Sequence, residues 1–285
     1  MEFGFFVEPL APGAFGCYNK LEYVSEWREY MDGIAAWMAQ LRWDSMLDVL
    51  ITALAAVLCI TFHETCHGLA ALALGDPTAR RMGRLSLNPL KHVDLGGLLM
   101  LMIAKVGWAK PVPVDARYFK NPRAGMAIVS IAGPLSNVLL SAVAAVGYTA
   151  SMFYSIYLEQ SWLEVPASFF YYVFYISAGL AVFNLLPIPP LDGSKVVFSF
   201  LPKKYYWKLM RYERYGMLAL MALLLTGMLD IPLNFLREGL IGLLVPISEW
   251  TMELLYALHV RLSNDRTEIP ARGHRPHENG GNGGL

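Results

Sequence analysis

Residues 48–75 read DVLITALAAVLCITFHETCHGLAALALG, and this apolar run decides the fold of the chain. About 20 predominantly apolar residues in a helix suffice to cross the hydrocarbon core of a bilayer, so the run is long enough to span it. Its second half contains His63, Glu64 and His67. An ionisable side chain in mid-span costs on the order of 3 kcal/mol on insertion scales, and such residues are usually functional. The run therefore predicts a membrane helix that carries a polar site.

The composition of the whole chain agrees with a membrane protein. Hydrophobic residues make up 55% of the sequence, charged residues 16%, and the mean hydropathy is +0.40, whereas soluble domains carry about 25% charged residues. A formal net charge of zero argues against a nucleic-acid partner. Three cysteines are too few for a disulfide framework or a thiolate metal site, and no removable signal peptide is predicted.

Four more apolar stretches are predicted to span the membrane: 125–157, 166–187, 215–229 and 240–258. The apolar run 95–104 is too short for a crossing and is predicted to be re-entrant or interfacial. We therefore expect an all-α polytopic membrane protein with five to six transmembrane helices and a short re-entrant or β-like element near the site.

Basic residues predict the orientation of the chain. Nineteen of the 23 lysines and arginines fall in three segments, 80–123, 195–214 and 261–275. Five spans place all three segments on one side of the membrane. The positive-inside rule then makes that side cytosolic and leaves the N-terminus outside.

His63, Glu64 and His67 form the pattern HExxH. Histidines at positions i and i+4 share one face of a helix, so both imidazoles can reach one metal ion, and the glutamate can deprotonate a water molecule. The alternative is a purely structural role, in which these polar groups only form hydrogen bonds between neighbouring helices.

A catalytic zinc site usually takes three protein ligands and leaves a fourth position open. Asp192, at the end of NLLPIPPLDG (residues 184–193), is the best third ligand, because its prolines and glycine can turn the chain back towards the metal. Alternatively, Asp192 only caps a proline-rich exit from the membrane. Glu159, Glu164 and Asp230 are rivals that lie towards the opposite face in the predicted topology.

These motifs together resemble the site-2 protease family of intramembrane zinc metalloproteases. HExxH is followed in order by GDPTARRMGRLSLNPLKHVD (75–94), GWAKPVPV (107–114), GPLSN (133–137) and the NLLPIPPLDG segment. The resemblance covers about residues 48–201. It is closest to the compact prokaryotic members, because the sequence offers no room for a PDZ insertion between the spans or for a CBS domain in the segment after the last predicted span.

The resemblance implies that His63, His67 and Asp192 bind one zinc ion per chain and that Glu64 is the general base. It further implies that Asn184 lies near the metal, as an oxyanion or substrate contact, and that Asn137 packs at the core beside the site. For Asn137, a plain interhelical hydrogen bond is an equal alternative.

The predicted spans, the composition of the two ends and the extent of the resemblance divide the chain. Its predicted parts are an extracytoplasmic or interfacial segment (1–47), a catalytic transmembrane core (48–201), C-terminal transmembrane helices (202–260) and a disordered cytosolic tail (261–285). The implied partners are the lipid bilayer and single-pass membrane proteins, cut within their transmembrane segments in regulated intramembrane proteolysis. The oligomeric state stays open, a homo-oligomer included.

Proteolysis requires water and an unwound substrate. We therefore expect a polar cavity that opens to the cytosol, and an edge strand within 107–114 that pairs with the substrate. Two other functions compete: a membrane protein that binds, senses or transports the metal without proteolysis, and a soluble-type zinc protease tethered to the membrane. An intact Glu64 argues against the first, and the place of HExxH within a span argues against the second.

Overall fold

The computed structural model describes residues 46–92, 94, 96, 110–211 and 213–267. The chain divides into two compact units, residues 1–51 and 52–285, and only 46–51 of the first are described. The predictions for residues 1–45, for most of the apolar run 95–104 and for the tail from 268 lie outside the described residues.

The described part is helical and contains no strand. Its α-helices are α2 (Met46–Ala73), α3 (Thr78–Arg81), α5 (Pro122–Leu158), α6 (Glu164–Leu185), α7 (Asp192–Ser199), α8 (Lys203–Arg211), α9 (Glu213–Leu225) and α10 (Asp230–Thr267). Short 3-10 helices are η2 (Pro89–Lys91), η3 (Ala116–Tyr118) and η4 (Ser161–Leu163). The predicted all-α fold is thereby confirmed for the described residues.

Four of the described helices are long and apolar enough to cross a membrane: Met46–Ala73, Pro122–Leu158, Ser161–Leu185 and Asp230–Leu262. This is fewer than the five to six expected. The predicted span 215–229 corresponds to α9, whose 13 residues extend about 20 Å at 1.5 Å per residue, less than the ~30 Å hydrocarbon core.

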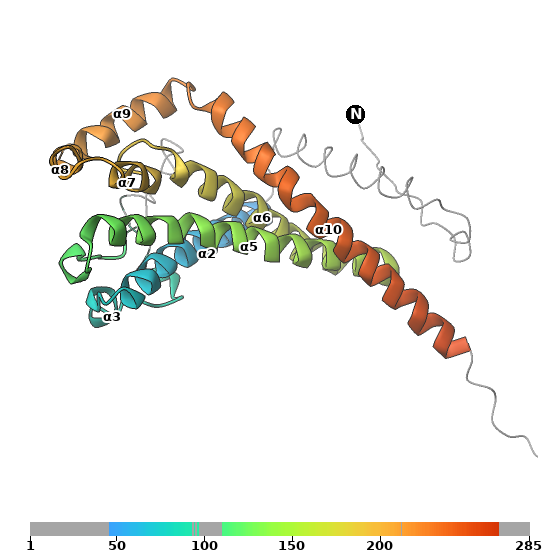
Figure 1. The fold of residues 1–285 in the computed structure, drawn as a ribbon. Coiled ribbons are helices and arrows are strands. Elements are labelled where there is room, and N and C mark those ends of the chain that lie inside the picture. The colour runs from blue at the N-terminus through green and yellow to red at the C-terminus, as the bar shows by residue number, and fades with distance from the viewer. Residues whose placement is uncertain (1–45, 93, 95, 97–109, 212, 268–285) are drawn as a thin grey trace, which may run out of the picture. The chain divides into compact units, whose positions relative to one another are not determined.

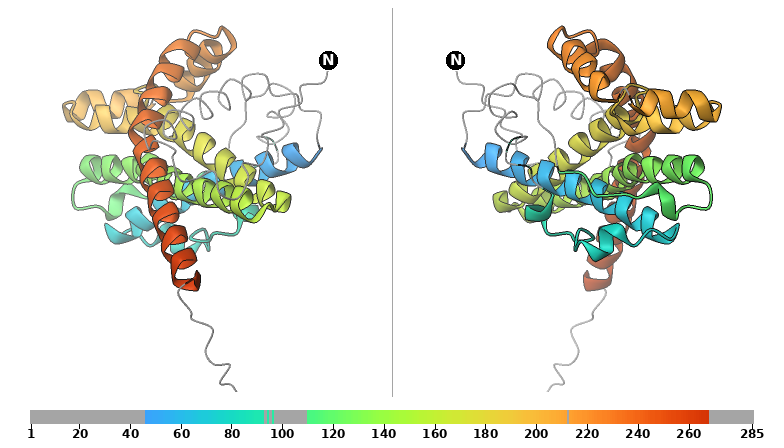
Figure 2. Two further views of the ribbon diagram at one scale, coloured as in Figure 1. Left: turned by 90° about the vertical axis from the view of Figure 1, so that its right-hand side faces the viewer. Right: turned by 90° about the vertical axis from the view of Figure 1, so that its left-hand side faces the viewer.

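Helices α5 and α6 form the centre of the larger unit and lie side by side along much of their length (Figure 1). Small side chains line their buried faces, including Ser141, Ala144 and Ala145 of α5 and Ala178 and Ala181 of α6. Small residues let membrane helices approach closely. Close van der Waals packing then holds the helices together, because lipid supplies no hydrophobic force between them. Helix α10 crosses this pair on one side (Figure 2).

Buried polar side chains organise the segment between α2 and α5. Asp76, which is fully buried just after α2, accepts hydrogen bonds from the backbone N–H groups of Thr78 (2.9 Å) and Asp115 (2.7 Å). The buried guanidinium of Arg84 donates to the carbonyls of Lys110 (2.8 Å) and Pro111 (3.1 Å). The stretch around residue 111 is therefore fixed to the loop that follows α2.

The prolines after α6 end that helix and reverse the chain into α7. Helix α6 ends at Leu185, and α7 begins at Asp192. A Cβ added to Gly193 would lie 2.6 Å from the carbonyl oxygen of Leu186, so only glycine lets the start of α7 pack this closely on the end of α6. The reversal places Asp192 in the first turn of α7.

Candidate metal centre

Helix α2 presents its two histidines on one buried face. His63 is 5% exposed and His67 8%, and their Nε2 atoms lie 2.9 Å apart. The i, i+4 spacing on one helix produces this convergence, as the sequence predicted.

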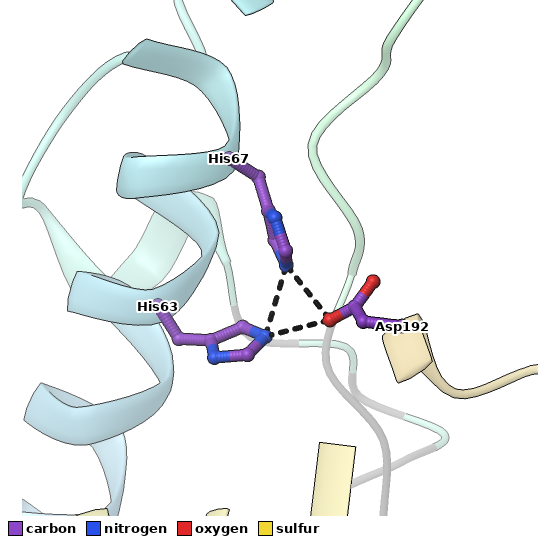
Figure 3. Close-up of side chains that lie close together, drawn as sticks. All are labelled: His63, His67 and Asp192. Carbon is purple, nitrogen blue, oxygen red and sulfur yellow. Dashed lines mark hydrogen bonds and ion pairs between the residues drawn. The ribbon is translucent and has the colours of Figure 1, made fainter. Parts of the chain in front are cut away.

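Asp192 reaches the two imidazoles from α7, which lies more than 120 residues further along the chain. Its Oδ2 atom lies 3.3 Å from the Nε2 of His63 and 3.0 Å from the Nε2 of His67 (Figure 3). These three residues form a group whose ligand atoms are close enough to hold one metal ion. Among the rivals considered for the third ligand, neither Glu159, Glu164 nor Asp230 belongs to this group.

The separations within the group suit zinc. Ligand atoms about 2.0–2.1 Å from a tetrahedral zinc ion lie about 3.3 Å from one another, and the three separations found are 2.9, 3.0 and 3.3 Å. Two imidazole nitrogens and one carboxylate oxygen are also a known donor set of catalytic zinc, which leaves a fourth position for water or substrate.

Each of the three side chains has a partner for the atom that does not face the centre. Nδ1 of His67 donates to the carbonyl of Val129 on α5 at 2.7 Å, so Nε2 carries the lone pair that a metal requires. Nδ1 of His63 lies 3.1 Å from the amide nitrogen of Asn137. Oδ1 of Asp192 lies 3.6 Å from Nζ of Lys195. These partners orient the group.

Asp192 supplies the negative charge of the centre. Burial opposes ionisation of its carboxyl, but the interactions with His63, His67 and Lys195 together outweigh burial and lower its pKa below the ordinary value. An ionised carboxylate beside two imidazoles is a favourable environment for a divalent cation.

Glu64 lies beside the group without being part of it. Its side chain is partly exposed, and its Oε2 atom accepts a hydrogen bond from the backbone N–H of Val112 at 2.8 Å. One carboxylate oxygen is therefore held by the segment that Arg84 fixes, and the carboxylate stands apart from the three ligand atoms.

The two asparagines occupy different environments. Asn137 is completely buried and bonds to His63, which agrees with its interpretation as an interhelical hydrogen-bonding residue. The amide nitrogen of Asn184 donates to the carbonyl of Leu180 on its own helix at 2.9 Å. This hydrogen bond directs the Asn184 amide along α6, and the described contacts of Asn184 do not include the metal-binding group.

Of the segment 107–114, in which an edge strand is predicted, the structure describes residues 110–114. Residues 110–114 form no strand. The N–H of Lys110 bonds to the carbonyl of His92 at 2.8 Å, and the N–H of Val112 bonds to Glu64. These two donors are already engaged, so the pairing of a substrate with this segment stays a prediction.

Three further residues contribute to the site although the sequence predicted no role for them: Gly133, Val112 and Lys195. A Cβ added to Gly133 would lie 2.6 Å from Cε1 of His63 and closer still to the ring of His67. A glycine is therefore required where α5 passes the two histidines. The GPLSN motif contained this signal, because glycine in a helix often marks a close approach.

Two histidines on a helix long enough to span a membrane, joined by an aspartate of α7 in a group that can hold a metal ion, are the fold and site of a membrane-embedded metalloprotein. Comparison of its sequence with known families agrees. The model of peptidase family M50 matches residues 51–227, and the chain belongs to that family. The resemblance to site-2 proteases is thereby confirmed, and zinc is the cofactor that the family and the donor set imply.

Similar proteins occur in bacteria and archaea. YwhC of Bacillus subtilis is 36% identical over 60% of this chain and 78% of its own length. Rip2 of Mycolicibacterium smegmatis is 29% identical over 70% of this chain and 76% of its own. MJ0611 of Methanocaldococcus jannaschii is 30% identical over 54% and 72%. All three are named, provisionally, as zinc metalloproteases. No solved structure matches the chain significantly.

Replacement of Gly133 tests whether the close approach of α5 shapes the metal site. Gly133→Ala is expected to lower zinc affinity at least about tenfold, because its methyl group displaces both imidazoles from positions that a metal site requires to within about 0.5 Å. Bound zinc in purified protein, measured by elemental analysis after dialysis against a chelator, gives the result.

Gly179→Ala on α6 is the matched control, since no atom lies within 4 Å of an added Cβ there. Equal zinc retention in both variants would contradict a role of Gly133 in admitting the histidines.

Proposed function

We propose that this chain is an intramembrane zinc protease of the site-2 type that cuts peptide bonds within transmembrane segments of other membrane proteins. One observation carries the proposal: His63, His67 and Asp192 converge to within 3.3 Å at a helix long and apolar enough to span a membrane, with the carboxylate of Glu64 beside them. Membership of peptidase family M50 supports proteolysis as the reaction.

In this proposal His63, His67 and Asp192 hold the zinc ion. When bound, zinc supplies Lewis acidity and lowers the pKa of water towards about 7. The protein side chains hold the metal and transfer the proton. His67 lies six residues before the end of α2 at Ala73, which is about 9 Å along the helix. A short polar passage from the membrane surface is then enough to bring water to the site.

Glu64 acts as the general base. Its Oε2 is held by the N–H of Val112 at 2.8 Å, which leaves Oε1 to take a proton from the attacking water and to pass it to the leaving amine. A carboxylate fixed through one oxygen loses less conformational freedom on reaching the transition state than a free one. In a site used only for binding or transport, this carboxylate would have no task.

Removal of the N–H group of Val112 tests this positioning. Val112→Pro is expected to lower kcat about tenfold or more with bound zinc unchanged, since small displacements of a catalytic group can cost up to about 10²-fold. Val112→Ala shortens the same side chain but keeps the N–H, so a much smaller loss is expected. Equal losses of kcat in the two variants would assign the effect to packing of the Val112 side chain.

The proposed substrates are single-pass membrane proteins. A transmembrane helix hides its peptide bonds within its own hydrogen bonds, so the substrate must unwind locally before Glu64 and the metal can reach a carbonyl. Cleavage of such a protein would release a fragment from the membrane, as in regulated intramembrane proteolysis. Asn184, which now bonds to its own helix, could contact the unwound substrate only after that bond breaks.

Cleavage of model substrates tests the proposed function directly. Wild type is expected to cut within the membrane segment of at least some members of a panel of single-pass proteins in liposomes. Glu64→Gln removes the base but none of the three proposed ligands, so it should bind zinc normally and lose at least about 10²-fold in rate. Cleavage sites are read by mass spectrometry.

The controls separate proteolysis from metal binding alone. Wild type that holds zinc but cuts no panel member, including products of neighbouring genes, would favour the sensing or transport alternative. Cleavage by Glu64→Gln at the wild-type rate would remove the proposed role of Glu64.

We also propose that the N-terminus lies outside and that the active site opens to the cytosol. The two basic-rich connections, between α2 and α5 and after α6, lie on the same side whether four or five segments cross. The bases at 261–275 join that side only if residues 215–229 also cross, which is our proposal. A helix this short would require local thinning of the bilayer.

Thiol labelling of intact cells tests this orientation. Single cysteines at the exposed positions Lys120, Gln160 and Arg261 are introduced after replacement of the native cysteines. A membrane-impermeant reagent is expected to label Gln160→Cys but neither Lys120→Cys nor Arg261→Cys. Labelling of Lys120→Cys would invert the orientation, and labelling of both Gln160→Cys and Arg261→Cys, but not Lys120→Cys, would show that residues 215–229 do not cross.

A further inference from the structure

Asn137 on α5 is buried against the metal-binding group in an arrangement that leaves one of its atoms unused. Its side chain is 0% exposed, and its Nδ2 atom lies 3.1 Å from Nδ1 of His63. Its Oδ1 atom is buried and has no hydrogen-bond partner among the described residues. A buried acceptor left unpaired costs about 1–3 kcal/mol, so this arrangement calls for an explanation.

The chemistry of His63 supplies the explanation. A neutral imidazole carries a proton on one nitrogen and a lone pair on the other. The Nε2 atom of His63 faces His67 and Asp192, so it must carry the lone pair if the group holds a metal ion. The proton is then on Nδ1, and an N–H group cannot accept a hydrogen bond from the amide NH₂ of Asn137.

We infer that Asn137 is a positioning residue for the zinc site and that its amide oxygen accepts the Nδ1 proton of His63 when metal is bound. The inference rests on the proposed function of the same site. A turn of the amide by about 180° exchanges oxygen and nitrogen in nearly the same space. That single rotation pairs the buried oxygen and selects the tautomer of His63 whose Nε2 can bind metal.

The second histidine already shows the same design. Nδ1 of His67 donates to the carbonyl oxygen of Val129 at 2.7 Å. A carbonyl can only accept, so the tautomer of His67 is set by the backbone of α5. Asn137 does for His63, with a side chain, what Val129 does for His67 with its main chain. Such outer partners fix ring orientation and raise the basicity of the ligand.

The geometry of α5 explains why an asparagine can reach this position. Gly133 and Asn137 are four residues apart and therefore lie on one face of the helix. Gly133 passes so close to the two imidazoles that a Cβ would collide with them. One turn later, the short Asn137 side chain spans the remaining gap to His63.

Two substitutions at this position separate an acceptor from a donor. Asn137→Asp keeps an oxygen facing His63 but, when ionised, cannot donate a hydrogen bond, whereas Asn137→Leu keeps the number and branching of the side-chain heavy atoms and offers neither an acceptor nor a donor. If Asn137 accepts, zinc affinity should fall about 10–100-fold in Asn137→Leu and stay within about threefold of wild type in Asn137→Asp. If Asn137 donates, both variants should lose affinity.

Ser141→Ala is the matched control for loss of a buried polar group from the same face. Ser141 lies one turn beyond Asn137, is fully buried, and donates to the carbonyl of Phe174 on α6 at 2.8 Å. Its removal is expected to lower thermal stability while zinc affinity is unchanged. A purely structural role of Asn137 would give the same pattern in Asn137→Leu.

The experiment measures zinc affinity of the full chain in detergent by competition with a chromogenic chelator, and the tautomer by NMR of ¹⁵N-histidine-labelled protein loaded with zinc. We expect the His63 proton on Nδ1, together with the affinity pattern of an acceptor. A proton-bearing Nε2, unchanged affinity in Asn137→Leu, or equal losses in both variants would overturn the inference. If Asn137→Leu does not fold, the affinity of Asn137→Asp and the tautomer of the wild type decide.

Wild type that binds no zinc at all would instead refute the proposed function. That outcome is distinct from failure of the inference alone, in which wild type binds zinc but the variants do not follow the acceptor pattern.

Discussion

The structure depends on bringing two imidazoles and one carboxylate together among helices that are otherwise apolar. Each of these groups would be costly if it stood alone in a membrane interior, and a buried charge is tolerated only when it is paired or bound to a metal. His63, His67 and Asp192 lie within 3.3 Å of one another, so each compensates the others. A bound cation would complete that compensation, because it neutralises the carboxylate and uses both imidazole lone pairs.

Many features of the surrounding fold follow from this requirement. Helix α5 must pass close enough to α2 to contact both histidines. This explains why residue 133 is a glycine and why the carbonyl of Val129 accepts a hydrogen bond from His67. Helix α6 must end before the metal centre, and the chain must reverse so that α7 can direct Asp192 inward. Gly193 permits that reversal by its close contact with the end of α6. Glycines at these two positions are as much a part of the site as the ligands.

A second set of polar contacts joins the loops to the chemistry. Arg84 binds the carbonyls of Lys110 and Pro111, and the adjacent Val112 donates to Glu64. An arginine that is bonded to carbonyls rather than to a carboxylate acts here as a geometric clamp, because its planar fork reaches several acceptors at once. The segment 110–112 thus connects a buried basic residue of the loop to the proposed catalytic base.

The sequence by itself determined the class of fold, the HExxH pair and the identity of Asp192 as the best third ligand. These follow from local rules: the length of apolar runs, the i, i+4 geometry of one helix, and the ability of NLLPIPPLDG to break a helix. Among the described residues, four helices are long and apolar enough to span a membrane, and α9 is shorter than the stretch predicted there, since hydropathy does not show where the turn after α9 falls. Only the tertiary structure decided which groups support the ligands. Val112 and Gly133 act on Glu64 and on the two histidines through distances between segments far apart in the chain, and no periodicity in a single sequence encodes such distances.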